Sequence, residues 1–351
     1  MLNRLNTPTN CLIFTTFAYT KYIHITHETQ RPKMNVIDIL KAQTSPKFSF
    51  EVLPPLKGKS INQLFKNIDS LMEFKPNYIN ITTHRSELVY KSIQGGLYQR
   101  VSERNRPGTV AVAAAIQNKY NIVAVPHLIC SGFSRVETEY ALIDLNFLGI
   151  SNLLLLRGDK AKHDSRFIPN EGGNAHACEL IDQVNTFNSG CFCDGTSMDV
   201  VSGTKFTYGV AGYPEKHDEA PNLDFDLQML KNKVDKGADY IVTQMFFDNE
   251  KFFDFVRRCR EIGINVPIIP GIKPISKTYQ MNVLPKIFHV DMPTALTEEL
   301  AKCKDDNAAK EVGIEWCYAQ SKELIEHGFT NIHYYTTMAT QSVRKVAERL
   351  F

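Results

Sequence analysis

The chain has 351 residues, of which 43% are hydrophobic and 22% charged, and its formal net charge is +2 at pH 7. This is ordinary globular composition, and the length fits either two average domains or one large α/β barrel. The nearly balanced charge argues against a general nucleic-acid-binding protein, which would carry a concentrated basic excess.

Residues 1–33 differ from the rest of the chain. The apolar stretch Cys11–Tyr19 is threonine-rich, lacks a small-residue cleavage site and is far too short to cross a membrane. Met34 offers an alternative start. We therefore expect residues 1–33 to be disordered or untranslated, and residues 34–351 to form the folded domain.

From residue 47 onward, short apolar runs alternate with amphipathic stretches. Eight runs are predicted as strands: Phe48–Leu53, Tyr78–Thr82, Ile122–His127, Asn152–Arg157, Phe206–Tyr213, Tyr240–Phe246, Pro267–Gly271 and Asn331–Tyr335. The stretch beginning at Ile61 has helical periodicity, and Ser134 with Glu137 forms a capping box before another helix.

A glycine follows four of the amphipathic stretches and precedes a strand by two or three residues, at Gly149, Gly237, Gly263 and Gly328. Each fits a left-handed helix C-cap. Regular helix–glycine–strand order predicts parallel strands joined by crossover helices, and eight units favour a closed (β/α)8 TIM barrel. The alternative is an open doubly wound sheet, which the absence of a GxGxxG fingerprint disfavours.

The first predicted strand carries a carboxylate toward the barrel axis. Alternation places Phe48 and Phe50 toward the helices, and Ser49 and Glu51 toward the axis. Apolar surroundings should raise the pKa of Glu51 and keep it protonated, as a general acid requires. A buried structural glutamate paired with a lysine or arginine is the equally weighted alternative.

Other polar residues occur where the predicted strands end, which is where barrel enzymes carry their chemistry. They are Thr82, His127, the Arg157-Gly158-Asp159 segment, the Tyr213 to His217 segment and Gln244. His127 is as readily a satisfied core histidine, and Arg157 with Asp159 an internal salt bridge. Asp248 is more simply explained as a helix N-cap.

Basic residues follow the fourth and fifth predicted strands. The loop from Lys160 to Asn174 is rich in charge and glycine, and Lys231 and Lys233 lie on a helix that begins near Asp224. Together they could bind a diphosphate, although most such runs are solvated faces. P-loop, HExxH and GxSxG motifs are absent, so phosphoryl transfer, zinc proteolysis and serine hydrolysis lack support.

The eight cysteines include no CxxC pair, and Cys191-Phe-Cys193 has no second Cys or His pair to complete a metal site. We predict no metal. Free thiols in a chain this long indicate a reducing compartment, and we expect a cytoplasmic protein without membrane association.

Nine segments, in this order, resemble the methylenetetrahydrofolate reductase family. They are Ser49–Pro55, Ile81-Thr82, Pro126–Leu128, Leu156–Asp159, Tyr213–His217, Leu230–Ala238, Thr243–Asp248, Ile269–Pro274 and His333–Thr336. Each is weak alone, but the set runs from about residue 40 to about residue 340. The chain stops soon after the eighth predicted strand, so it resembles the short bacterial form without a regulatory domain.

The resemblance implies that FAD takes electrons from NAD(P)H and passes them to 5,10-methylenetetrahydrofolate in ping-pong fashion, giving 5-methyltetrahydrofolate for methionine biosynthesis. It implies Glu51 as the general acid for opening the folate ring and Asp159 as a negative charge beside the flavin and pterin. Gln244 would bind the pterin or the nicotinamide. Relatives form homo-oligomers, and the same is expected here.

The resemblance also implies the FAD contacts Thr82, His127, Arg157, Gly158, Asp159, Tyr213, His217, Asp226 and Lys233. His176 falls where relatives often carry a tyrosine beside the adenine. Thr278, with Tyr279 beside it, takes the place of an aromatic residue that stacks on substrate. Met229, Asn232 and the Thr337–Ala339 segment also depart from the family, which leaves the folate-tail contacts and the nucleotide preference open.

Two other functions are compatible with these residues. A different flavin barrel, such as a proline dehydrogenase, would not need an acid on the first strand. A flavin-free barrel could be a lyase or a non-catalytic binding module.

Overall fold

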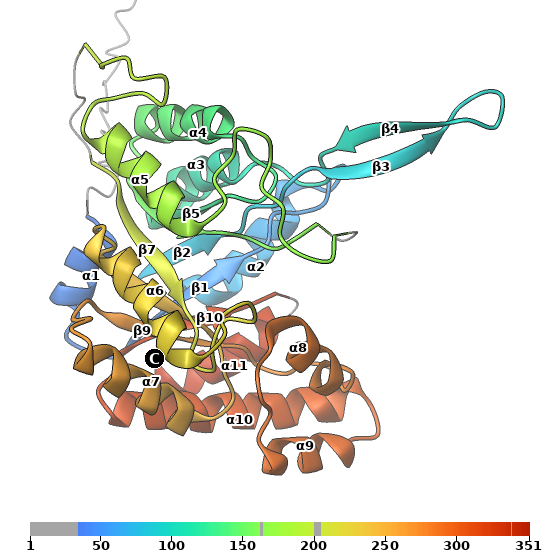
Figure 1. The fold of residues 1–351 in the computed structure, drawn as a ribbon. Helices are drawn as coiled ribbons and strands as arrows, with labels where there is room; N and C mark the ends of the chain where they lie inside the picture. Colours follow the sequence, from blue (N-terminus) through green and yellow to red (C-terminus); the bar gives the residue numbers. More distant parts are fainter. Residues whose placement is uncertain (1–33, 162–163, 200–204, 338) are drawn as a thin grey trace, which may run out of the picture. The chain divides into compact units, whose positions relative to one another are not determined.

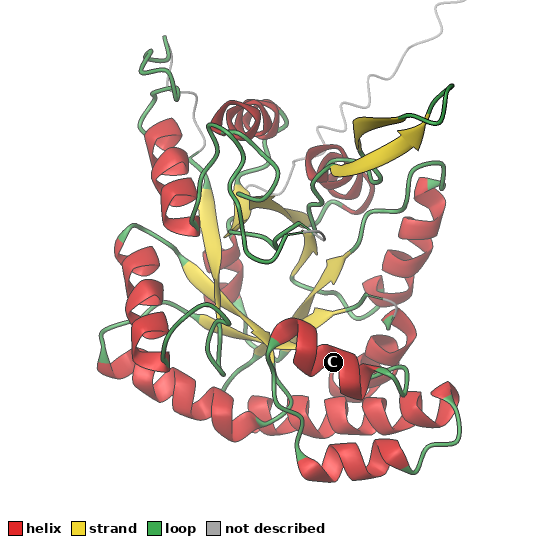
Figure 2. Ribbon diagram, turned by 45° about the vertical axis from the view of Figure 1, so that its right-hand side comes forward, coloured by secondary structure: helices red, strands yellow, loops and turns green. Residues whose placement is uncertain are grey.

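The computed structural model describes residues 34–161, 164–199, 205–337 and 339–351, so the expectation for residues 1–33 lies outside the described residues. The described residues, from Met34 onward, belong to one compact unit. Its strands form a closed barrel in the order β1-β10-β9-β8-β7-β6-β5-β2, with helices around the outside (Figures 1 and 2). Every neighbouring pair is parallel. The predicted (β/α)8 barrel is confirmed.

The barrel strands are β1 (Lys47–Val52), β2 (Tyr78–Ile81), β5 (Val123–Ile129), β6 (Asn152–Leu156), β7 (Thr207–Gly212), β8 (Tyr240–Met245), β9 (Ile268–Ile272) and β10 (Asn331–Tyr335). The helices are α1 (Val36–Ala42), α2 (Ile61–Met72), α3 (Thr109–Tyr120), α4 (Arg135–Phe147), α5 (Ala177–Asn188), α6 (Leu223–Asp235), α7 (Asn249–Glu261), α8 (Gln280–Phe288), α9 (Thr294–Ala301), α10 (Asp306–Glu326) and α11 (Thr340–Leu350).

Local signals place the ends of several helices. Gly149, Gly237, Gly263 and Gly328 all have positive φ, between 69° and 111°, as the predicted left-handed caps require. Ser134 and Glu137 form the predicted capping box of α4. The predicted N-cap of α7 is also present, because the Asp248 side chain accepts a hydrogen bond from the backbone N–H of Glu250.

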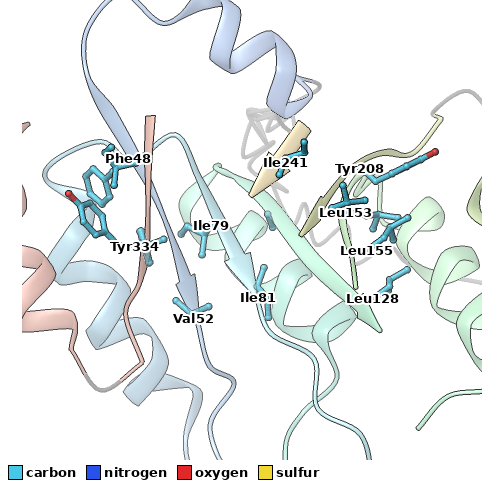
Figure 3. Close-up of a cluster of buried hydrophobic side chains, with 14 of the residues drawn as sticks. Phe48, Val52, Ile79, Ile81, Leu128, Leu153, Leu155, Tyr208, Ile241 and Tyr334 are labelled. Carbon is cyan, nitrogen blue, oxygen red and sulfur yellow. The ribbon is translucent and has the colours of Figure 1, made fainter. Parts of the chain in front are cut away.

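Among the described residues, buried apolar side chains form two layers in the barrel and a third cluster that includes Met245, Phe247, Leu284 and Leu296. The outer layer lies between strands and helices and includes Phe48, Val52, Ile79 and Tyr334 (Figure 3). The inner layer fills the half of the barrel interior nearer the amino ends of the strands. It consists of Tyr78, Val123, Val125, Leu154, Tyr240, Val242 and Ile269. Val36 of α1 joins this inner layer, and its backbone N–H donates to Asn152 Oδ1 at 2.9 Å.

The structure contains an antiparallel hairpin that was not predicted from the sequence. Strands β3 (Glu87–Ser92) and β4 (Tyr98–Glu103) form a separate two-stranded sheet between β2 and α3, which projects from the barrel in Figure 1. Lys57 holds the base of the hairpin to the loop after β1 through an ion pair with Glu103 and a 2.8 Å backbone hydrogen bond to Asn105.

No helix among the described residues is long and apolar enough to cross a membrane. All seven cysteines in the described part of the chain are free thiols.

Candidate active site

The half of the barrel interior nearer the carboxyl ends of the strands is polar. Because Phe48, Phe50 and Val52 belong to the outer layer, strand alternation turns Ser49 and Glu51 inward, as predicted. The same alternation turns six further polar residues inward: Asn80, His127, Gln244, Lys273, His333 and Tyr335. Among the described residues, the barrel therefore carries its inward-facing carboxyl, ammonium and imidazole groups toward the carboxyl ends of the strands, where barrel enzymes bind substrate.

Glu51 is the central carboxyl group of this polar layer. Its side chain is 13% exposed, and its Oε2 atom lies 4.0 Å from Nε2 of His127. Burial raises the pKa of Glu51 to about 7, and the charge of Lys273 acts in the opposite direction. The expectation of a raised pKa is confirmed, and Glu51 has no lysine or arginine within ion-pair distance among the described residues.

Two histidines beside Glu51 are held neutral. Burial lowers the pKa of both His127 and His333 to about 3. Ser49 Oγ lies 2.9 Å from Nδ1 of His333. The Nε2 atoms of both rings and the side-chain amide of Asn80 are buried without a hydrogen-bond partner among the described residues. Because buried polar atoms are normally satisfied, this group fits a ligand with polar edges.

The Tyr335 side chain reaches from β10 across β9 to β8. Its hydroxyl donates to the carbonyl of Thr243 at 2.6 Å. The ring occupies the space above Gly271, where a Cβ atom would come within 2.3 Å of the Thr243 carbonyl oxygen and 2.7 Å of the tyrosine ring. Glycine at 271 is therefore needed for this position of the tyrosine.

A second polar group lies along the ends of β6 and β7. Gly158 has φ of +80°, a conformation that favours glycine. Arg157 pairs with Glu219 and stacks on the ring of Phe167 at 4.8 Å. The alternative of an Arg157–Asp159 salt bridge is therefore not supported, since the partner is Glu219 and Asp159 is exposed.

The start of α6 packs against the end of β7. The rings of Tyr213 and His217 meet edge to face at 4.8 Å, and the backbone N–H of His217 donates to Asp226 at 2.9 Å. Lys233 Nζ donates to the carbonyl of Ala211 at 2.8 Å. Burial lowers the pKa of Lys233, and the nearby Asp226 raises it.

Comparison with known protein families identifies the family of this chain. The family profile described as methylenetetrahydrofolate reductase matches residues 36–351. The chain belongs to the methylenetetrahydrofolate reductase family.

Relatives within the methylenetetrahydrofolate reductase family differ in length. Methylenetetrahydrofolate reductase (NADH) 1 of Arabidopsis thaliana is 33% identical over 322 residues, which cover 88% of this chain and 49% of that protein. The chain thus spans about half the length of the first curated relatives it matches. The 5,10-methylenetetrahydrofolate reductase of Salmonella typhimurium is 30% identical over 313 residues, covering 88% of this chain and 92% of that protein.

A solved structure shares the fold of this family member. It is an uncharacterized protein from Clostridium thermocellum that binds two copies of 5-methyl-5,6,7,8-tetrahydrofolic acid. The TM-score is 0.54 at 15% identity, with 89% of this chain and 97% of that chain covered. The likeness supports the barrel architecture alone.

The residues expected to contact FAD in this methylenetetrahydrofolate reductase family member fall into two sets. Arg157, Gly158, Asp159, Tyr213 and His217 follow the neighbouring strands β6 and β7, and Asp226 and Lys233 lie in the first and last turns of α6. Thr82 follows β2, and His127 lies within the neighbouring strand β5. His176 is exposed as the N-cap of α5 and makes no side-chain cap hydrogen bond. Cys178, two residues later, acts on the pKa of Lys233.

The expected substrate residues are less closely grouped. Gln244 is half-buried, and its Oε1 accepts from the backbone N–H of Met245 at 2.9 Å. Thr278 bonds to Asp306 through its backbone N–H at 3.1 Å, and Tyr279 is 51% exposed. Lys231 pairs with Asp235 on its own helix, so it does not share the contacts of Lys233.

Sequence reasoning missed Lys273 and Tyr335 as members of the site. Both lie within segments that carry the family resemblance, yet neither was assigned a role. The signal was available for Lys273: counting alternate residues from inward-facing Ile269 through Gly271 reaches Lys273.

Proposed function

We propose that this chain reduces 5,10-methylenetetrahydrofolate to 5-methyltetrahydrofolate, using FAD and NAD(P)H. The observation that carries the proposal is Glu51, a buried carboxyl group at the barrel mouth whose pKa of about 7 lets it donate a proton near neutral pH. Family membership and relatives of similar length that carry this enzyme name support it.

The described residues fit FAD as the cofactor. Arg157, His217 and Lys233 supply basic groups, and Gly158 allows the backbone to approach a ligand closely. The buried Nε atom of Arg157 and Nε2 atom of His127 are without protein partners among the described residues. Thr82, Asp159, Tyr213 and Asp226, with His176 beside the adenine, complete the proposed set. Bound FAD would supply hydride transfer between the nicotinamide and the folate.

The proposed work of the protein is acid catalysis and placement. Protonated Glu51 gives its proton to the folate ring nitrogen that leaves, which opens the five-membered ring to an iminium. General acid help of this kind is worth about 10²–10⁴-fold. The negative charge of Asp159 favours the cationic iminium. The amide of Gln244 can match the donors and acceptors of the pterin.

The same proposal covers the organisation of the protein. Residues 34–351 act as one catalytic domain in the cytoplasm, and copies of the chain associate into a homo-oligomer. Size-exclusion chromatography with light scattering measures the association. A protein that is monomeric at all concentrations tested would contradict the proposed homo-oligomer.

The decisive experiment separates the two half-reactions. Protein reconstituted with FAD is reduced anaerobically by NADH or by NADPH, which also gives the nucleotide preference, and is then mixed with methylenetetrahydrofolate. Reoxidation of the flavin absorbance is expected. If only proline exchanges electrons with the flavin, the protein is a different flavin barrel. If the protein does not take up FAD, a flavin-free barrel is correct.

Glu51→Gln tests the acid directly. The variant should bind FAD and oxidise NAD(P)H as the wild type does, while the folate half-reaction slows by about 10²-fold or more. Glu326→Gln, which removes an exposed carboxylate on α10, is the matched control. Equal losses in both half-reactions would exclude Glu51 as the acid.

A further inference from the structure

Lys273 is a buried cation that the proposed mechanism does not use. It follows β9 at the barrel mouth and is 8% exposed. Its Nζ atom donates to the carbonyl of Thr337 at 3.3 Å. No carboxylate in the described part of the chain lies within ion-pair distance of Lys273. Burying an ammonium group with a single neutral acceptor is costly, so its position calls for a further interaction.

The strand register brings Lys273 close to Glu51. Glu51 pairs with Tyr335 across β1 and β10, and Tyr334 pairs with Ile272 across β10 and β9. The next pair in this register is Tyr335 with Lys273. Strands lie about 4.8 Å apart, so Glu51 and Lys273 are separated at the backbone by about 10 Å. Their two inward-facing side chains are long enough to span most of that distance.

The other groups that face Glu51 are uncharged. His127 from β5 and His333 from β10 are neutral because burial lowers the pKa of each to about 3. Tyr335 is neutral because burial raises the pKa of its hydroxyl. Ser49 and Asn80 do not ionise. Among the described residues, Lys273 is therefore the one cation that acts on Glu51. Burial lowers the pKa of Lys273, and the charge of Glu51 acts in the opposite direction.

We propose that Lys273 is a positioning residue for the proton of Glu51: its buried charge sets the pH at which Glu51 gives up and regains that proton. Without this charge, the apolar surroundings would hold the proton on Glu51 to higher pH. The carboxylate left after proton donation would then be harder to form. With the charge, donation and recovery of the proton are balanced near neutral pH. The catalytic consequence rests on the proposed function, whereas the effect on the proton does not.

The test follows the Glu51 carboxyl group itself. Infrared spectroscopy of the holoenzyme detects the C=O stretch of a protonated carboxyl group, and the band absent in Glu51→Gln is assigned to Glu51. We expect Lys273→Met and Lys273→Gln to move the midpoint of this band upward by about one pH unit. Lys273→Arg, which keeps the charge, should hold the midpoint near that of the wild type. Lys322→Met, at an exposed lysine of α10, is the matched control.

Activity gives a second readout. The alkaline limb of the pH profile of the folate half-reaction should move upward with the infrared midpoint in Lys273→Met and Lys273→Gln, while reduction by NAD(P)H keeps its profile. Unchanged midpoints in both variants would overturn the proposal, as would a shift of equal size in Lys273→Arg. Because the infrared titration requires no folate turnover, a shifted midpoint in an enzyme inactive with folate would support the role of Lys273 while rejecting the proposed reaction.

Discussion

The burial of Glu51 predicts a protein that loses stability as the pH rises. In the unfolded chain the pKa of this carboxyl group is about 4.5, and in the folded protein it is about 7. The folded state therefore holds the proton more tightly than the unfolded state. The stabilisation from protonated Glu51 is complete below pH 4.5, and it is lost as the pH rises through about 7.

The size of this effect follows from the two pKa values. Each pH unit between them corresponds to about 1.4 kcal/mol, so the whole interval is worth about 3 kcal/mol. Between about pH 5.5 and about pH 8.5, linkage gives a loss of about 2 kcal/mol in the free energy of unfolding. Glutamine has nearly the same shape as glutamate and does not ionise, so Glu51→Gln should lack this loss.

The assay is urea unfolding of wild type and Glu51→Gln, followed by circular dichroism at these two pH values. Subtracting one protein from the other cancels the titration of His127, His333 and the remaining groups. We expect the free energy of unfolding of Glu51→Gln, relative to that of the wild type, to be about 2 kcal/mol higher at the higher pH than at the lower pH. A difference that is the same at both pH values would refute the reasoning, because it would mean that Glu51 ionises in the folded protein as it does in water.

Three further predictions test other parts of the site. Asp159→Asn should slow the folate half-reaction by roughly tenfold, or about 1.4 kcal/mol, and an unchanged stopped-flow rate would remove Asp159 from the mechanism. Gly271→Ala should lower the free energy of unfolding by about 1–3 kcal/mol, because its Cβ collides with the Thr243 carbonyl; denaturation as stable as wild type would contradict this. The pKa of His333 is about 3 in the folded state, so the stabilisation from its neutral form is present above pH 6.5 and is lost as the pH falls through 3. His333→Gln should therefore show a smaller loss on acidification, measured by urea unfolding at several pH values.

Local sequence signals were sufficient to predict most strands and helices of the barrel. Strand alternation placed Glu51 inward, and the glycines after the helices marked the crossovers, because both depend on backbone geometry within a few residues. The β3–β4 hairpin lacked such a signal. Leu88, Tyr90 and Tyr98 are 42%, 67% and 69% exposed, so the hairpin has no fully buried face to impose a clear apolar pattern.

The surroundings of Glu51 could not be predicted from local pattern in the same way. Tyr335 of β10 and Lys273, directly after β9, come more than two hundred residues later in the chain, and barrel closure alone brings them to β1. The same limit applies to the pairing of Arg157. Its neighbour Asp159 was the natural candidate, but the partner is Glu219, which the loop after β7 brings to the end of β6.

The pairing of β1 with β10 also determines when this centre can assemble during synthesis. Lys47 pairs with Asn331 and Glu51 with Tyr335, so one edge of β1 has no partner until residues 331–335 have left the ribosome. An open edge is a template for association with other chains, and pairing between distant residues is slow. The strand that carries the proposed acid is thus the first barrel strand to be made and one of the last to be fully paired. Nascent chains halted before residue 331 should therefore be prone to aggregation.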